Sequence, residues 1–114
     1  MTRLLAELLA DASYHARRAA TYVEDIDFVE FATNAMRREA VCFCLIVVGE
    51  ACDRISKELQ SAPPEIAWSD IKAMRNVLVH EYWQIDHVIV YNVARNDAPL
   101  LADMLDDFAE RSEQ

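Results

Sequence analysis

The sequence has very few residues that favour turns, with one glycine and three prolines among 114 residues. A β-sandwich or β-barrel joins many short strands through turns, and such turns depend on glycine and proline. Apolar residues make up 54% of the chain and recur at intervals of three and four, as in helices that bury one face. The sequence therefore predicts an all-α protein, and its length predicts one domain over residues 1–114.

Long apolar segments are also absent. The longest uninterrupted apolar run covers residues 40–48, well short of the roughly 20 residues that span a bilayer. Arg3 and Glu7 interrupt the apolar N-terminal stretch, which is unlike a cleavable signal sequence. We expect a cytoplasmic protein that does not contact membranes.

Cysteines are few and odd in number. Cys42, Cys44 and Cys52 all fall in one expected helix. Positions two apart point to different faces, and positions eight apart lie about 12 Å apart along the axis, beyond the reach of a disulfide. The same spacing does not suit zinc. We interpret these residues as small buried side chains, and nothing in the sequence indicates a metal site, a glycine-rich phosphate loop or a cofactor.

Basic residues are outnumbered, with 11 Lys and Arg against 20 Asp and Glu and a net charge of −9. This balance argues against general nucleic-acid binding. Residues 51–80 include four basic and four acidic residues, whereas residues 81–114 include two basic and eight acidic residues, a net charge of −6. Any RNA contact must then be local, and its positive charge is expected from four residues: Lys72, Arg75, Arg37 and Arg38. The acidic C-terminal region would suit a basic protein partner.

Capping residues and apolar spacing predict four main helices. The first begins after Thr2 and runs to about Val23, and the second begins after Asn34 and runs to about Leu59. A short helix or turn over 24–33 should lie between them. The third is expected over 68–83, and the fourth after Asp86. The result is an antiparallel four-helix bundle with a short extra helix between the first two main helices.

Details of these helices carry further expectations. The buried face of the second is expected to comprise Ala40, Phe43, Cys44, Val47, Val48, Ala51 and Ile55. Pro99 should kink the fourth helix, since it cannot donate a hydrogen bond to the carbonyl of Arg95. Gly49 costs about 1 kcal/mol inside a helix relative to alanine, so we expect another backbone, from this chain or a second subunit, to approach there. Glu50 is either a solvated residue or a carboxylate that orients Arg75 or His80.

The segment from Arg75 to Tyr82 combines a permanent cation, a group that titrates near neutrality and a phenol. On a straight helix Arg75 and Tyr82 would lie about 20° apart on one stripe, and Asn76 and His80 form an i,i+4 pair. Cleaving RNA without a metal needs proton transfer and a cation for the phosphorane charge. His80 can transfer the proton and Arg75 can bind the phosphate. The structural alternative is a polar seam that holds a dimer together.

The chain resembles the HepT-like branch of the HEPN superfamily between about Asn34 and Pro99. The resemblance rests on Gly49-Glu50-Ala51, on Pro64 followed by Trp68, on the run from Arg75 to Tyr82, and on Ile85-Asp86. It implies the toxin of a toxin–antitoxin pair, a metal-independent endoribonuclease that cleaves its RNA substrate at a composite homodimer site. In that reading Arg75 and His80 are catalytic, with Asn76, Glu50 and Tyr82 in support.

The resemblance also implies a partner, a minimal nucleotidyltransferase that acts as antitoxin. Tyr82 would then be the acceptor of an AMP group, and the alternative is that Tyr82 simply packs as a partly buried aromatic residue. We expect the homodimer to form largely through the second and fourth main helices. The alternative function is a non-catalytic helical binding module that presents nucleotide or substrate to the partner nucleotidyltransferase.

Overall fold

The computed structural model describes residues 1–113, and every regular element in this range is a helix. The elements are α1 (Arg3–Thr21), α2 (Phe28–Ala32), α3 (Ala35–Glu58), α4 (Trp68–His80), the 3₁₀-helix η1 (Tyr82–Gln84), α5 (His87–Asn92), the π-helical turn η2 (Val93–Asp97) and α6 (Ala98–Ser112). The expected all-α class is confirmed. No helix within the described range combines the length and hydropathy that a bilayer span requires.

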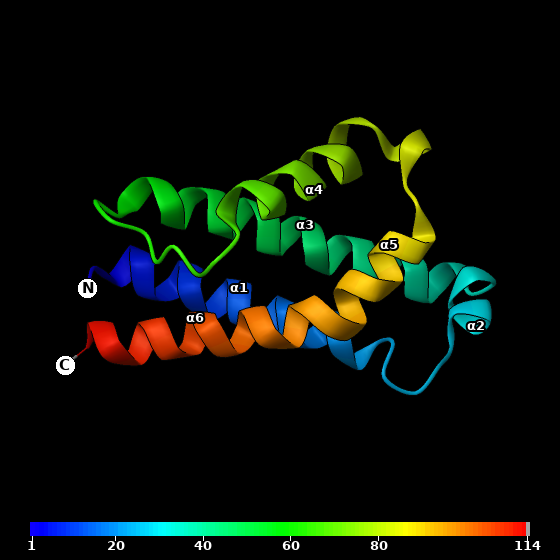
Figure 1. Ribbon diagram of the computed structural model, residues 1–114, viewed down its shortest axis with the longest axis horizontal. Coiled ribbons are helices and arrows are strands. Elements are labelled where there is room, and N and C mark those ends of the chain that lie inside the picture. Colours follow the sequence, from blue (N-terminus) through cyan, green and yellow to red (C-terminus); the bar gives the residue numbers. More distant parts are fainter. Residues whose placement is uncertain (114) are drawn as a thin grey trace.

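The long helices lie side by side with neighbours antiparallel (Figure 1). Helix α1 packs against both α3 and α6, and α4 packs along the opposite side of α3. The two termini lie at the same end of the molecule. The short helix α2 sits between α1 and α3 in the chain, so the expected bundle with its extra helix is confirmed.

Three helices begin at the residues that the sequence indicated. The Thr2 side chain accepts a hydrogen bond from the Leu5 N–H at 3.1 Å, and Asn34 Oδ1 accepts one from the N–H of Arg37 at 3.1 Å. Asp86 Oδ1 accepts the N–H of Val88 at 2.9 Å and begins α5. Each contact satisfies an N–H group that has no partner within the helix, so local sequence sets these boundaries.

The buried face of α3 differs from the expected one. Cys44, Val48 and Ile55 are buried, as predicted, but Phe43 is 60% exposed. Phe43 lies about 140° around the helix from the buried Val48, and its ring stands edge to face with His15 of α1, with centroids 6.1 Å apart. The prediction for Phe43 was wrong because three-four spacing alone does not show which side of a helix its neighbours occupy.

Pro99 falls in the first turn of α6, directly after the π-helical turn. The Ala98 N–H donates to the carbonyl of Val93, five residues back. The sequence predicted an interruption here because Pro99 cannot donate to Arg95, and the structure gives it the form of a π turn. The helix changes direction between α5 and α6 (Figure 1).

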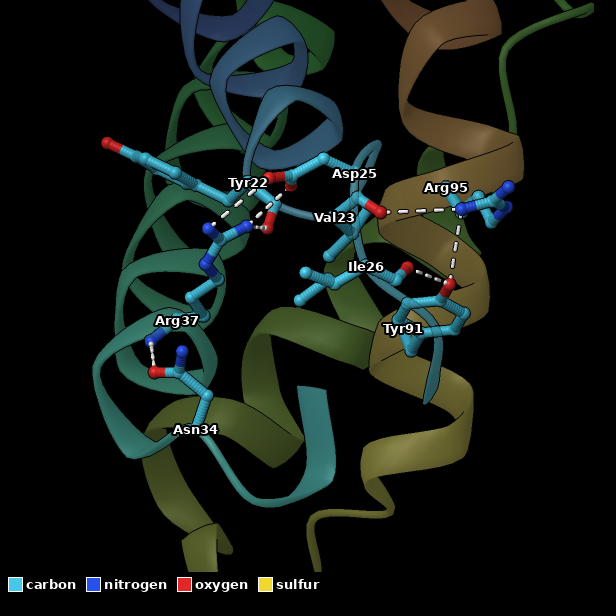
Figure 2. Close-up of polar contacts among 8 residues, drawn as sticks. All are labelled: Tyr22, Val23, Asp25, Ile26, Asn34, Arg37, Tyr91 and Arg95. Carbon is cyan, nitrogen blue, oxygen red and sulfur yellow. Dashed lines mark hydrogen bonds and ion pairs between the residues drawn. The ribbon is translucent and has the colours of Figure 1, made fainter. Parts of the chain in front are cut away.

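A polar cluster fixes the loop between α1 and α2 (Figure 2). Tyr91 Oη donates to the Ile26 carbonyl at 2.6 Å, and Arg95 Nη1 donates to the Val23 carbonyl at 3.3 Å and to Tyr91 Oη at 3.1 Å. Tyr91 is buried, so its hydroxyl needs such a partner. These contacts tie the loop to the helix segment formed by α5 and η2.

Candidate active site

The site is built where α3 crosses α4 at Gly49. A Cβ atom on Gly49 would overlap the Cβ of Arg75 and lie 2.7 Å from its Cγ. The expected close approach at Gly49 is therefore confirmed, and the approaching element is α4 of the same chain. Gly49 is consequently not available as a contact for a second subunit, which removes it as support for a dimer through the second main helix.

The Arg75 side chain is held in place by residues of both helices. Its Nη1 donates to Glu50 Oε1 at 2.6 Å, and its Nε donates to Asn76 Oδ1 at 2.9 Å. The Arg75 side chain is only 12% exposed. Glu50 fits both interpretations, because its side chain is 55% exposed and its carboxylate also accepts the hydrogen bond that orients Arg75. Asn76 accepts a hydrogen bond from the same guanidinium rather than contacting His80.

Asp53 completes the cluster, and the sequence interpretation did not include it. Its carboxylate lies 2.9 Å from Lys57 Nζ, 3.5 Å from Lys72 Nζ and 3.9 Å from Arg75 Nη2. The hydrogen bond from Lys57 lowers the pKa of Asp53, with a further contribution from the charge of Lys72. Asp53 follows Gly49 by one helical turn, so it shares the face that α4 covers. That spacing could have identified it.

His80 and Tyr82 lie beyond this cluster at the surface. His80 is the exposed last residue of α4, because Glu81 leaves the helical conformation with φ −135° and ψ 44°. Tyr82 begins η1 and is 71% exposed. The expected continuation of α4 to residue 83, and with it the shared stripe of Arg75 and Tyr82, was wrong. The chain then turns through η1, and Asp86 caps α5.

Tyr82 also does not pack as a partly buried aromatic residue. Its ring contacts Trp83 edge to face, with centroids 5.5 Å apart, and both rings are exposed. Among residues 1–113, no hydrogen bond or ion pair joins His80 or Tyr82 to Arg75. The structure therefore brings Arg75, Asn76 and Glu50 together and leaves His80 and Tyr82 facing solvent.

Arg37 and Arg38 contact the segment around α2 and not the Arg75 cluster. Arg37 Nη1 donates to the Tyr22 carbonyl at 3.0 Å and to Asp25 Oδ1 at 2.6 Å (Figure 2). The hydrogen bond from Arg37 lowers the pKa of Asp25. Arg38 Nη1 donates to the Ala32 carbonyl at 2.6 Å. Both guanidinium groups stabilise the segment around α2, so of the four expected cations only Lys72 and Arg75 lie in the cluster.

All three cysteines are free thiols; Cys44 and Cys52 are buried, as expected, whereas Cys42 is only half-buried. Burial raises the pKa of Cys52 to about 12, so that thiol stays protonated at neutral pH and is a poor nucleophile. Within residues 1–113, no group of three or more His, Cys, Asp and Glu side chains is arranged to hold a metal ion.

Comparison with known proteins identifies the family. Residues 13–108 match the family model described as "HepT-like: Ribonuclease HepT-like". The chain is 32% identical over 91 residues to "Putative RNase MJ1380" of Methanocaldococcus jannaschii, covering 80% of this chain and 84% of that protein. It is 27% identical over 101 residues to "Probable ribonuclease HepT" of Thermococcus cleftensis, covering 89% of this chain and 92% of that protein. No solved structure matches. The chain belongs to the HepT-like family of the HEPN superfamily.

Proposed function

We propose that this protein is an endoribonuclease that cleaves RNA without a metal ion and acts as the toxin of a toxin–antitoxin pair. The family match and the names of its relatives support ribonuclease activity. The observation that carries the proposal is the fixed position of Arg75, which Glu50 and Asn76 hold at the Gly49 crossing, five residues before the exposed His80. Arg75 and His80 are the proposed catalytic residues.

Arg75 retains the capacity to bind a phosphate. A guanidinium carries five N–H donors, and Glu50 and Asn76 each accept one of them. The remaining donors can bind a non-bridging phosphate oxygen and stabilise the charge of the phosphorane. Glu50 and Asn76 thus act as positioning residues, because they orient the group that binds the phosphate.

His80 would transfer the protons. The 2′-oxygen of the RNA attacks the adjacent phosphorus and loses its proton to a base, while the bond from phosphorus to the 5′-oxygen breaks and that oxygen receives a proton from an acid. The products are a 2′,3′-cyclic phosphate and a 5′-hydroxyl. An imidazole can serve in either role near pH 7. One chain supplies one His80, so two imidazoles require a second copy of the site.

The surface around His80 suits a homodimer. Val79, Tyr82 and Trp83 flank it and are 42%, 71% and 67% exposed. Neighbouring exposed apolar side chains are typical of interaction surfaces. A symmetric dimer through this surface would bring two His80 side chains and two Arg75 clusters to one cleft. This interface differs from the one expected from Gly49, which α4 already covers.

The exposure of Tyr82 supports its proposed modification by a minimal nucleotidyltransferase antitoxin. The phenol oxygen would attack the α-phosphorus of ATP, forming a new P–O bond as pyrophosphate leaves, and its proton would pass to a base of the transferase. The AMP group would add negative charge and bulk two residues from His80. RNA entry to the composite cleft would then be blocked.

The test is RNA cleavage by the purified protein in EDTA. Wild type should cleave, and His80→Ala and Arg75→Ala should lose at least about a hundredfold in rate, as expected for a general acid–base group and a phosphorane-stabilising cation. His15→Ala is the matched control, because His15 lies on α1 outside the Arg75 cluster, with its Nδ1 2.9 Å from the Asp11 carbonyl and its ring against Phe43. Equal cleavage by wild type and His80→Ala would contradict the proposal.

The second candidate is a non-catalytic module that presents nucleotide or substrate to the nucleotidyltransferase. It is favoured by the carboxylates of Glu50 and Asp53, which offset the positive charge of Arg75, and by the net charge of −9. The same assay separates the two candidates. No cleavage by wild type, together with tight binding to the transferase, would establish the module.

A further inference from the structure

A cavity of about 410 Å³ opens between α4 and α6. Helix α4 forms one wall and α6 the other, with α1 and α3 beneath. Its apolar lining includes the side chains of Leu45, Val48, Ile71, Met74, Leu101 and Met104. Its size is within the range of ligand-binding cavities, roughly 300–1,000 Å³. The proposed catalytic residues Arg75 and His80 are not among the lining residues.

The fold leaves this space open for two reasons. Helix α4 packs along α3, whereas α6 packs along α1 (Figure 1), so α4 and α6 do not close on each other. The π-helical turn Val93–Asp97 also borders the cavity, through Val93 and Asp97. Such turns widen a helix locally and frequently occur at functional sites.

The charged residues that line the cavity are all acidic. They are Glu65, Asp70 and Asp97, and no lysine or arginine lines it within residues 1–113. Arg111 lies 3.5 Å from Glu65. The surrounding C-terminal region adds further negative charge, with a net of −6 over residues 81–114. An apolar interior with an acidic rim favours an occupant that is apolar on one face and positively charged on the flanks, and it disfavours RNA.

We propose that this cavity is a docking site for a basic amphipathic helix of a partner protein. Apolar side chains on one face of the partner helix would fill the space between α4 and α6, and flanking lysines or arginines would face Glu65, Asp70 and Asp97. Recognition of this kind, with an amphipathic helix in an apolar groove, follows ordinary helix spacing. Because Met74 precedes Arg75, an occupant would contact the helix that carries the guanidinium without touching the guanidinium itself.

Tryptophan fluorescence offers a direct binding assay. The chain has two tryptophans, and Trp83→Phe leaves Trp68, which follows the lining residue Ala67 and donates from Nε1 to the Pro63 carbonyl at 3.0 Å. The probe is a synthetic amphipathic helix of leucine and lysine, about 18 residues long so that it is helical in water. It should change the Trp68 emission saturably, and a helix with glutamate in place of lysine should not.

Two variants locate the binding. Ala67→Phe adds bulk at the rim of the cavity without changing charge, and the double variant Asp70→Asn with Asp97→Asn removes rim charge. Each should weaken binding by about tenfold or more. The matched control is Asp11→Asn with Glu39→Gln, which removes two exposed carboxylates that do not line the cavity. It should bind within about twofold of the parent.

Three results would overturn the proposal. Equal weakening by the control and the rim variants would mean general attraction to an acidic protein. Saturation by octylamine as tight as that by the helix would assign the cavity to a small cationic amphiphile. A loss of oligomer mass in light scattering for Ala67→Phe would assign it to a second copy of this chain. Unchanged thermal unfolding of Ala67→Phe would show that the variant is folded.

Discussion

Gly49 and Arg75 meet where α3 crosses α4, so closely that the Cγ of Arg75 lies 2.7 Å from the position a Cβ on Gly49 would take. The only glycine of the chain therefore stands beside the arginine of the motif. The crossing also places Glu50 within 2.6 Å of the Arg75 guanidinium. Helix packing and the position of the candidate phosphate-binding group are thus set by the same contact.

Gly49→Ala should destabilise the protein. In an uncrowded helix this change would stabilise by about 1 kcal/mol, but overpacking costs about 1–3 kcal/mol, so we expect a net loss of up to about 2 kcal/mol. Urea unfolding measures the free-energy change. RNA cleavage should fall as well, because Arg75 has to shift. A gain in stability would contradict the packing described here.

Asp53→Asn should destabilise the protein in a pH-dependent way. The hydrogen bond from Lys57, helped by Lys72, holds the pKa of Asp53 below its ordinary value. A carboxyl group whose pKa is lowered by folding stabilises the protein at pH values above its unfolded pKa of about 3.9. This stabilisation is lost as the pH falls through the lower pKa of the folded state. We expect Asp53→Asn to lower the free energy of unfolding by less than about 1 kcal/mol at pH 6. This difference should shrink towards zero below about pH 4.

Urea unfolding of wild type and Asp53→Asn at pH 6 and pH 3 measures this dependence. Lys57→Met removes the main donor to Asp53 and should reproduce part of the loss at pH 6. A difference between wild type and Asp53→Asn that is the same at both pH values would show that the Asp53 charge is not its source.

Val79→Asp should weaken the proposed homodimer. Val79 adjoins His80 and is exposed, and placing a charge in an apolar interface costs at least about 1–2 kcal/mol per subunit, or more than tenfold in the dimer dissociation constant. Light scattering over a concentration series measures the dimer dissociation constant. Leu4→Asp is the control, because Leu4 is also exposed and lies in the first turn of α1. Equal masses for wild type and Val79→Asp at all concentrations would place the interface elsewhere.

Tyr82→Phe should prevent the proposed AMP transfer and leave the fold intact. The change removes one exposed hydroxyl, so the free energy of unfolding should stay within about 1 kcal/mol. With the transferase and ATP, wild type should gain the mass of one or more AMP groups and lose its toxicity, whereas Tyr82→Phe should do neither. Intact-protein mass spectrometry provides the measurement. Neutralisation of an unmodified wild type would show that complex formation alone inhibits it.

The sequence by itself determined the features of this protein that depend on contacts between residues close together in the chain. Thr2, Asn34 and Asp86 cap their helices through contacts within three residues, so the helix starts depend on nothing distant. Helical spacing and the scarcity of turn-forming residues predicted the all-α class. Gly49 indicated a close approach because its cost inside a helix needs a compensating contact, although its partner had to come from the fold.

Tertiary structure decided which side chains meet. Arg37 pairs with Asp25, and Arg75 with Glu50 and Asp53, according to how each helix is rotated and which face a neighbour covers. The exposure of Phe43 and the end of α4 at His80 have the same origin. A residue's spacing defines a stripe on its own helix, but only the packing of other helices determines whether that stripe is buried, paired or open to solvent.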